Sequence, residues 1–218
     1  MKRLVILISG RGSNLGAILS ARQAGQWPID VAAVISNRPA AEGLGLAQSY
    51  GIATQVVDHQ AFDSREAFDR ALAAQINALN PDLVVLAGFM RILSQEFFGA
   101  FSGKLLNIHP SLLPAFKGMR THAQALAAGV KVHGCTVHSV TPDLDHGPFL
   151  AMAVVPVLAG DDENRLAERV LEMEHILYPM AIAAVLSGRC ELRAHQWTDL
   201  GRGSFSHEFS PCIVHPSL

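Results

Sequence analysis

The first hundred residues alternate between short, continuous apolar runs and longer segments with helical spacing. The apolar runs predict strands buried on both faces, at residues 3–9, 31–36, 54–58 and 82–87. The segments between them predict helices at residues 15–24, 41–50 and 63–79, the last begun by a capping box that pairs Asp63 with Glu66. Because parallel neighbouring strands need crossover connections, this alternation predicts a Rossmann-like parallel sheet with helices on both faces.

The pattern changes in the second half. A short helix at 94–100, a strand at 104–108 and a helix at 121–128 are followed by two β-rich runs, 132–140 and 149–157. These two runs are close in sequence, and we expect them to pair as antiparallel neighbours. Acidic residues 161–163 then begin a helix that continues to about Leu186. Negative charges at the start of a helix interact favourably with the positive end of its dipole. The fold class is therefore α/β, a mostly parallel sheet with antiparallel strands added in the C-terminal half.

Composition favours one compact domain. Of the 218 residues, half are apolar and 17% are charged, which argues against disorder. No repeat or linker interrupts the pattern, so we expect a single domain at 1–200, with halves at 1–100 and 101–200, and a C-terminal tail at 201–218 that is rich in Gly, Ser, Pro and His.

Charge and cysteine content narrow the function classes. A net charge of -2 and a pI near 6.5 give no electrostatic reason to expect nucleic acid or an acidic membrane as partner, so a small molecule is favoured. The three cysteines are odd in number, far apart and without metal-ligand spacing. The apolar run at residues 4–8 is too short for a signal peptide, and no run reaches membrane-spanning length. We expect a cytoplasmic protein.

A glycine-rich segment, Gly10–Asn14, follows the first predicted strand. Glycines permit a tight turn, and the exposed amides at the next helix N-terminus form a site for an anion such as phosphate. The alternative is an ordinary turn in which Ser13 or Asn14 caps the helix. The segment is not a dinucleotide fingerprint, because Leu15 takes the place of the third glycine. Arg38, after the second strand, could still meet an NADP phosphate, so a reductase remains an alternative.

The segment Gly88–Leu93 follows the fourth predicted strand. Strand C-termini in open α/β sheets face the ligand, so backbone and apolar side chains at this position could hold a flat ring. The alternative is that its apolar side chains are core residues, namely Phe89, Met90, Ile92 and Leu93.

Asn107 and His109 lie at the end of the strand predicted at 104–108, where Pro110 and Pro114 end the extended segment. Residues two apart on a strand point the same way, so an amide and an imidazole would project together. An imidazole can exchange a proton and an amide N–H can hold a developing oxyanion. This pair is suited to acyl chemistry. The alternative is that His109 is a structural histidine.

A turn-rich loop, Thr141–Pro148, joins the two late β-rich runs. A carboxylate brought near His109 would favour its charged form. The alternative is that Asp143 and Asp145 only organise turns. The other histidines lack zinc-ligand spacing and are expected to be structural or on the surface, among them His133, His138, His207 and His215.

Four motifs together resemble the 10-formyltetrahydrofolate-dependent formyltransferase family. They are residues 8–15, 86–93, 107–114 and 144–148. The Asn-x-His-Pro-Ser-Leu-Leu-Pro motif marks the wider family, and the Ser-Gly-x-Gly-Ser-Asn start resembles the members that act on glycinamide ribonucleotide, the phosphoribosylglycinamide formyltransferases. The resemblance extends over about residues 1–195.

The resemblance implies a role for each motif. Gly12, Ser13 and Asn14 would bind the phosphate of glycinamide ribonucleotide, and Glu174 would help to hold that substrate. The first half would thus be phosphate-binding, and the second catalytic and folate-binding. Asn107, His109 and Asp145 would be catalytic. The folate-binding residues would be Arg65, Met90, Arg91, Ile92, Leu93, Asn107, Thr141, Asp143 and Asp145.

The implied reaction is formyl transfer from 10-formyltetrahydrofolate to the glycyl amine of glycinamide ribonucleotide, a step of de novo purine biosynthesis. It proceeds by direct attack and implies no metal, and the enzyme would be a monomer or a homodimer. Alternatives left open are another formyltransferase or hydrolase that uses this folate, an NADP-binding reductase, and a non-catalytic folate- or nucleotide-binding protein.

Two segments depart from the family pattern. His146 replaces a glycine in the Leu-Asp-Gly-Gly-Pro loop, and residues 115–120 lack the usual proline before Gly118. We expect both departures to alter loops beside the substrates.

Overall fold

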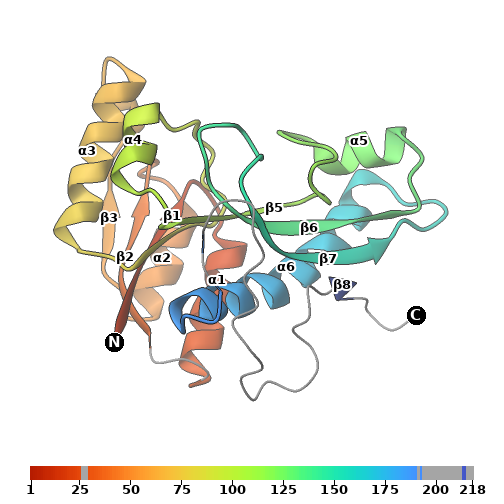
Figure 1. Cartoon of the computed structure of the whole chain (residues 1–218), viewed down its shortest axis with the longest axis horizontal. Coiled ribbons are helices and arrows are strands. Elements are labelled where there is room, and N and C mark those ends of the chain that lie inside the picture. The colour runs from red at the N-terminus through yellow and green to blue at the C-terminus, as the bar shows by residue number, and fades with distance from the viewer. Residues whose placement is uncertain (26–28, 191, 193–212, 215–218) are drawn as a thin grey trace. The chain divides into compact units, whose positions relative to one another are not determined.

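The computed structural model describes residues 1–25, 29–190, 192 and 213–214 (Figure 1). The chain divides into two compact units, Met1–Asn107 and Ile108–Leu218. Most of the tail expected at 201–218 lies outside the described residues. No helix in the described part of the chain combines the length and apolarity needed to cross a bilayer.

The first unit is built on a parallel sheet, as the alternating pattern predicts. Its strands, in the spatial order β3-β2-β1-β4-β5, are β3 (Thr54–Val56), β2 (Ile29–Ser36), β1 (Lys2–Ile8), β4 (Leu83–Leu86) and β5 (Leu105–His109), the last of which runs across the unit boundary. Residues 4–8 of β1 are completely buried, which explains why this strand is continuously apolar instead of alternating.

Helices connect these strands as crossovers. They are α1 (Ser13–Gln23), α2 (Glu42–Ser49), the 3₁₀ turn η1 (His59–Ala61), α3 (Arg65–Ala78) and α4 (Gln95–Ala100). The chain runs outward from β1 to β3 and then returns to β4 beside β1. Right-handed crossovers therefore place α1 and α2 on one face and α3 and α4 on the other, and each pair is in contact (Figure 1).

The predicted capping box of α3 is wrong by one residue. Ser64, not Asp63, is the N-cap, and its hydroxyl accepts a hydrogen bond from the backbone N–H of Ala67. Glu66 is therefore the second helical residue and too early for the reciprocal bond of a capping box.

The second unit is built on an antiparallel pair of strands, which confirms the prediction for the two late β-rich runs. Strands β6 (Val132–Ser139) and β7 (Phe149–Pro156) pair along their length. The 24-residue helix α6 (Glu163–Leu186) packs against both strands, and Asp162 caps it by accepting from the N–H of Arg165. The remaining elements are α5 (Thr121–Ala127) and β8 (Ile213–Val214), which pairs in parallel with β7.

Candidate active site

The glycine-rich segment leaves the end of β1 and enters α1 without a side-chain cap. Gly12 is the N-cap residue, with φ of 79°, and Ser13 and Asn14 are the first helical residues. The alternative in which Ser13 or Asn14 caps the helix is therefore wrong. The segment is held closely against the start of α2, because a Cβ on Gly12 would lie 3.0 Å from Cα of Gly43. The N–H groups of the first helical turn form the positive end of the helix dipole, which favours a bound anion.

The turn after β4 lies beside this segment, because β1 and β4 are hydrogen-bonded neighbours where the strand order reverses. Such a switch point is where open α/β sheets bind ligands. A direct hydrogen bond joins the two turns, from the backbone N–H of Met90 to Oγ of Ser9, at 2.8 Å.

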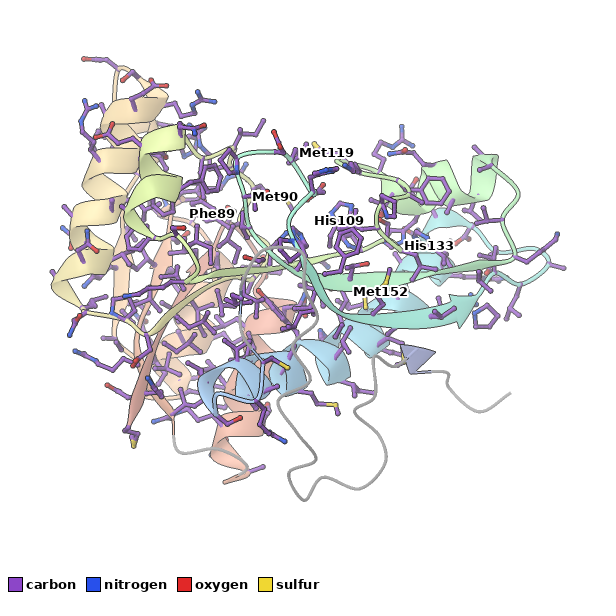
Figure 2. The ribbon with its side chains drawn as sticks, viewed as in Figure 1. Phe89, Met90, His109, Met119, His133 and Met152 are labelled. Atoms are coloured by element: carbon purple, nitrogen blue, oxygen red, sulfur yellow. The ribbon has the colours of Figure 1, made fainter. Side chains whose placement is uncertain are left out.

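The apolar side chains of the Gly88–Leu93 turn are of two kinds. Phe89 and Leu93 are 8% and 6% exposed and belong to the core, whereas Met90 and Ile92 are each 66% exposed. Figure 2 labels Phe89 and Met90 in this turn. The alternative that these side chains are core residues is therefore right for Phe89 and Leu93 and wrong for Met90 and Ile92. An apolar side chain held out in water is available to cover a flat apolar ligand.

The two arginines that are predicted to bind the folate, Arg91 and Arg65, both belong to the first unit. Arg91 places its guanidinium 5.3 Å from the ring centroid of Phe68, a cation–π contact that ties the turn to α3. Arg65 is the first residue of α3 and lies exposed, 3.2 Å from the carboxylate of Glu66. An exposed pair of this kind contributes little, so the Arg65 side chain remains available to an anionic group.

Asn107 and His109 occupy alternate positions of β5. Asn107 is half-buried and pairs in register with Leu86 at the end of β4. His109 is 6% exposed at the last position of the strand.

Both ring nitrogens of His109 face oxygen atoms. Nε2 lies 3.0 Å from the backbone oxygen of Phe116, and Nδ1 lies 3.5 Å from Oδ2 of Asp145. A carbonyl oxygen only accepts, so Nε2 donates to Phe116. An imidazolium would present a donor to each oxygen, whereas the neutral ring with its proton on Nε2 would turn a lone pair toward a carboxylate.

Asp145 is held in place by the backbone around it. Its own φ is 50°, an unusual value for a residue with a side chain, and it is 8% exposed. The N–H of Gly118 donates to Oδ2 at 2.9 Å. Asp145 is therefore more than a turn former, because its carboxylate lies between His109 and the loop 115–120.

His138 is a neighbour of this pair that sequence reasoning missed. Its Nε2 lies 3.8 Å from Oδ1 of Asp145, and it is 2% exposed near the end of β6. Burial lowers the pKa of His138, and the charge of nearby His109 lowers it further, although the backbone of Ser139 and the charge of Asp145 oppose the shift. The available signal was its position at the end of an alternating strand, directly before the Asp145 loop.

A second pair of histidines lies beyond the loop 115–120. Nε2 of His133 lies 3.2 Å from Nδ1 of His122, and the Phe116 ring meets the His133 ring edge-on at 5.8 Å. His133 is fully buried, and burial lowers its pKa to about 4. In Figure 2 both His109 and His133 lie on the α5 side of strands β6 and β7.

The two departures from the family pattern contact each other. Nζ of Lys117 donates to Nδ1 of His146 at 2.8 Å, which links the loop 115–120 to the Asp145 loop. The first of these loops follows a cis Leu113–Pro114 bond and contains two non-glycine residues with positive φ, Phe116 at 54° and Arg120 at 55°.

The remaining predicted site residues are Thr141, Asp143 and Glu174. Thr141 donates its hydroxyl to the backbone oxygen of Asp143 at 3.3 Å, and Asp143 is exposed. Glu174 is 6% exposed on α6. Burial raises the pKa of Cys135 in β6, and the negative charge of Glu174 adds to that shift. Among the residues that the structure describes, no group of three or more metal-ligating side chains comes together.

Comparisons with known proteins identify the family of this chain. Residues 2–182 match the family model described as formyl transferase. The phosphoribosylglycinamide formyltransferase of Escherichia coli (strain K12) is 49% identical over 197 residues, which are 90% of this chain and 93% of that protein. The trifunctional purine biosynthetic protein adenosine-3 of Bos taurus is 46% identical over 87% of this chain, but over only 19% of its own length.

Solved structures give the same result. Glycinamide ribonucleotide transformylase 1 from Symbiobacterium toebii superposes with a TM-score of 0.85 at 49% identity, covering 87% of this chain and 89% of that one. The phosphoribosylglycinamide formyltransferase from Coxiella burnetii superposes with a TM-score of 0.87 at 44% identity, covering 91% and 93%. These matches confirm the Rossmann-like formyltransferase fold and set the reductase alternative aside. The chain belongs to the formyl transferase family.

Proposed function

We propose that this chain transfers the formyl group of 10-formyltetrahydrofolate to the glycyl amine of glycinamide ribonucleotide. The chain spans 93% of the Escherichia coli relative that carries the corresponding name. The observation that supports the chemistry best is the buried pair of His109 and Asp145, 3.5 Å apart at the end of β5.

The phosphate of glycinamide ribonucleotide would bind at Gly12, Ser13 and Asn14. These residues open α1, where backbone N–H groups and the helix dipole favour a dianion. Glu174 would then hold the glycyl amine end of the substrate, since a carboxylate accepts hydrogen bonds from amine N–H groups.

The folate would lie against the turn after β4. Met90 and Ile92 offer apolar surface for the flat ring, and the exposed Arg65 offers a cation to the glutamate tail. Arg91, Leu93, Thr141 and Asp143 would complete the folate contacts. The formyl donor is a co-substrate that leaves as tetrahydrofolate.

The amine nitrogen attacks the formyl carbon, and the electrons of the C=O bond move to oxygen to give a tetrahedral oxyanion. Asn107 and the imidazolium of His109 stabilise that charge by donating hydrogen bonds. Nε2–H of His109 is donated to the backbone oxygen of Phe116 in the structure, so the substrate oxygen would replace that carbonyl.

Collapse of the intermediate needs a proton on N10 of the folate and loses one from the attacking amine. Asp145 would assist, because its carboxylate lies beside the His109 ring on one side and accepts the Gly118 N–H on the other. When the C–N10 bond breaks, the oxyanion electrons restore the formyl carbonyl on the new amide.

The purified chain incubated with both substrates tests this proposal. Tetrahydrofolate and formylated glycinamide ribonucleotide should form in equal amounts, and omission of the ribonucleotide should stop folate turnover. Formate release that does not need the ribonucleotide would indicate a hydrolase. The absence of any folate product would overturn the proposal.

A further inference from the structure

We propose that Ser9 and Asn37 are positioning residues for the folate co-substrate. They would fix the backbone of Met90 and thereby the exposed surface of the Gly88–Leu93 turn. The inference rests on the proposed function, because that function places the folate on this turn.

The hydroxyl of Ser9 joins two partners that are far apart in sequence. It donates to Oδ1 of Asn37 at 2.5 Å and accepts the backbone N–H of Met90 at 2.8 Å. A hydroxyl carries one hydrogen, and Ser9 donates it in the hydrogen bond to the Asn37 oxygen. The lone pairs of the Ser9 oxygen are then left to accept the N–H of Met90. Ser9 and Asn37 are 4% and 1% exposed, and water cannot readily substitute for either partner.

Asn37 is itself anchored on both sides. Its N–H donates to the backbone oxygen of Ile8 at 3.4 Å, and its own backbone oxygen accepts Nδ1–H of His59 at 2.7 Å. Asp58 lies 3.8 Å from the same ring nitrogen. Asn37, whose side-chain oxygen accepts the hydrogen bond from Ser9, is therefore held between β1 and η1.

The turn needs such a support because of what it exposes. Met90 and Ile92 are each 66% exposed, so side-chain burial does not hold them, while Gly88 at φ 74° begins the turn without a side chain. The bond from Met90 to Ser9 is the polar link that holds this part of the turn to the end of β1. Without it, the N–H of Met90 loses its acceptor on Ser9 and the turn is free to relax.

Ser36 provides a matched control for Ser9. Its buried hydroxyl also donates to one group and accepts from another at the end of a neighbouring strand, but both partners are backbone atoms of Arg38. Ser36→Ala and Ser9→Ala therefore remove the same kind of buried bridge, and only Ser9→Ala releases the Met90 turn.

The experiment measures the Kd of a 5,8-dideazafolate by calorimetry, KM for both substrates, kcat and Tm. Ser9→Ala should raise the Kd of the analogue and KM for 10-formyltetrahydrofolate by about tenfold, with KM for the ribonucleotide changed less than about twofold. Ser36→Ala should lower Tm comparably and leave the Kd unchanged. Equal losses in both variants, or equal rises of both KM values in Ser9→Ala, would overturn the inference.

A second variant covers poor folding of Ser9→Ala. Ser9→Cys keeps the side-chain shape with a weaker acceptor, so its Kd should be intermediate, and wild-type affinity in this variant would also count against the inference. Failure of the wild-type chain to bind the analogue overturns the proposed function and the inference with it. Wild-type binding with unchanged binding by Ser9→Ala overturns the inference alone.

Discussion

Oδ2 of Asp145 lies 3.5 Å from Nδ1 of His109, with both side chains only 7% exposed. His109 ends strand β5, and Asp145 belongs to the loop between β6 and β7. An imidazole–carboxylate contact that is shielded from water in this way acts more strongly on a transition state than the same contact at the surface.

Replacing either member should therefore impair the reaction more than the fold. His109→Ala and Asp145→Asn should each lower kcat by about 10²–10³-fold or more, because each removes a charge that acts mainly on the transition state. Circular dichroism should show unchanged secondary structure.

Asp161→Asn is the control for Asp145→Asn. Asp161 makes two hydrogen bonds to the guanidinium of Arg169, at 2.8 and 2.9 Å, and that pairing lowers its pKa to about 2. The control should lower Tm and keep kcat. Near-normal turnover in His109→Ala or Asp145→Asn would remove that residue from the mechanism.

Gly147→Ala should displace the Asp145 loop. A Cβ on Gly147 would lie 1.7 Å from the backbone oxygen of Ser139, which cannot move without breaking the end of the β6–β7 pairing. We expect a large loss of kcat together with a lower Tm. Gly99→Ala, within α4 and open on its Cβ side, should keep kcat and raise stability by up to about 1 kcal/mol. Full activity of Gly147→Ala would show that the Asp145 loop does not depend on this contact.

Gly12→Ala should separate backbone strain from phosphate binding. Gly12 has φ of 79° and meets Gly43, whereas Gly51 has φ of 71° with open space around it. Both Gly12→Ala and Gly51→Ala should cost about 1 kcal/mol or more in the free energy of unfolding. Only Gly12→Ala should raise KM for glycinamide ribonucleotide. The same KM in both variants would place the phosphate elsewhere.

His133→Gln should reduce the loss of folding stability as the pH falls below 6.5. The folded-state pKa of His133 is about 4, below the ordinary 6.5. The unfolded chain therefore binds a proton below pH 6.5 that the folded chain excludes, and stability falls as pH drops from 6.5 toward 4. Between pH 7 and pH 5, wild type should lose about 2 kcal/mol more than His133→Gln.

Urea unfolding at the two pH values measures this difference. Burial also lowers the pKa of His122, His138 and His175, so the variant should keep a smaller slope of the same sign. Equal pH dependence in the two proteins would show that His133 is protonated equally in the folded and unfolded chains.

The sequence by itself determined the elements and the chemistry carried by single residues. Buried strands such as β1 are continuously apolar, and helices such as α3 and α6 begin at a capping side chain, so both leave local patterns that are readable without neighbours. The positions of Asn107 and His109 at a strand end, and of the glycine segment before α1, follow from the same local rules. The one-residue error at Ser64 arose where two adjacent residues could both cap.

Only the tertiary structure decided which of these residues meet. The contacts of Asp145 with His109, of Ser9 with Met90 and of Lys117 with His146 join segments that the chain order keeps apart. They depend on strand order and on loop conformations with positive φ, as at Phe116 and Asp145, that local propensity does not favour. The physical reason is that packing of the whole unit, and not the preference of any single residue, stabilises those conformations.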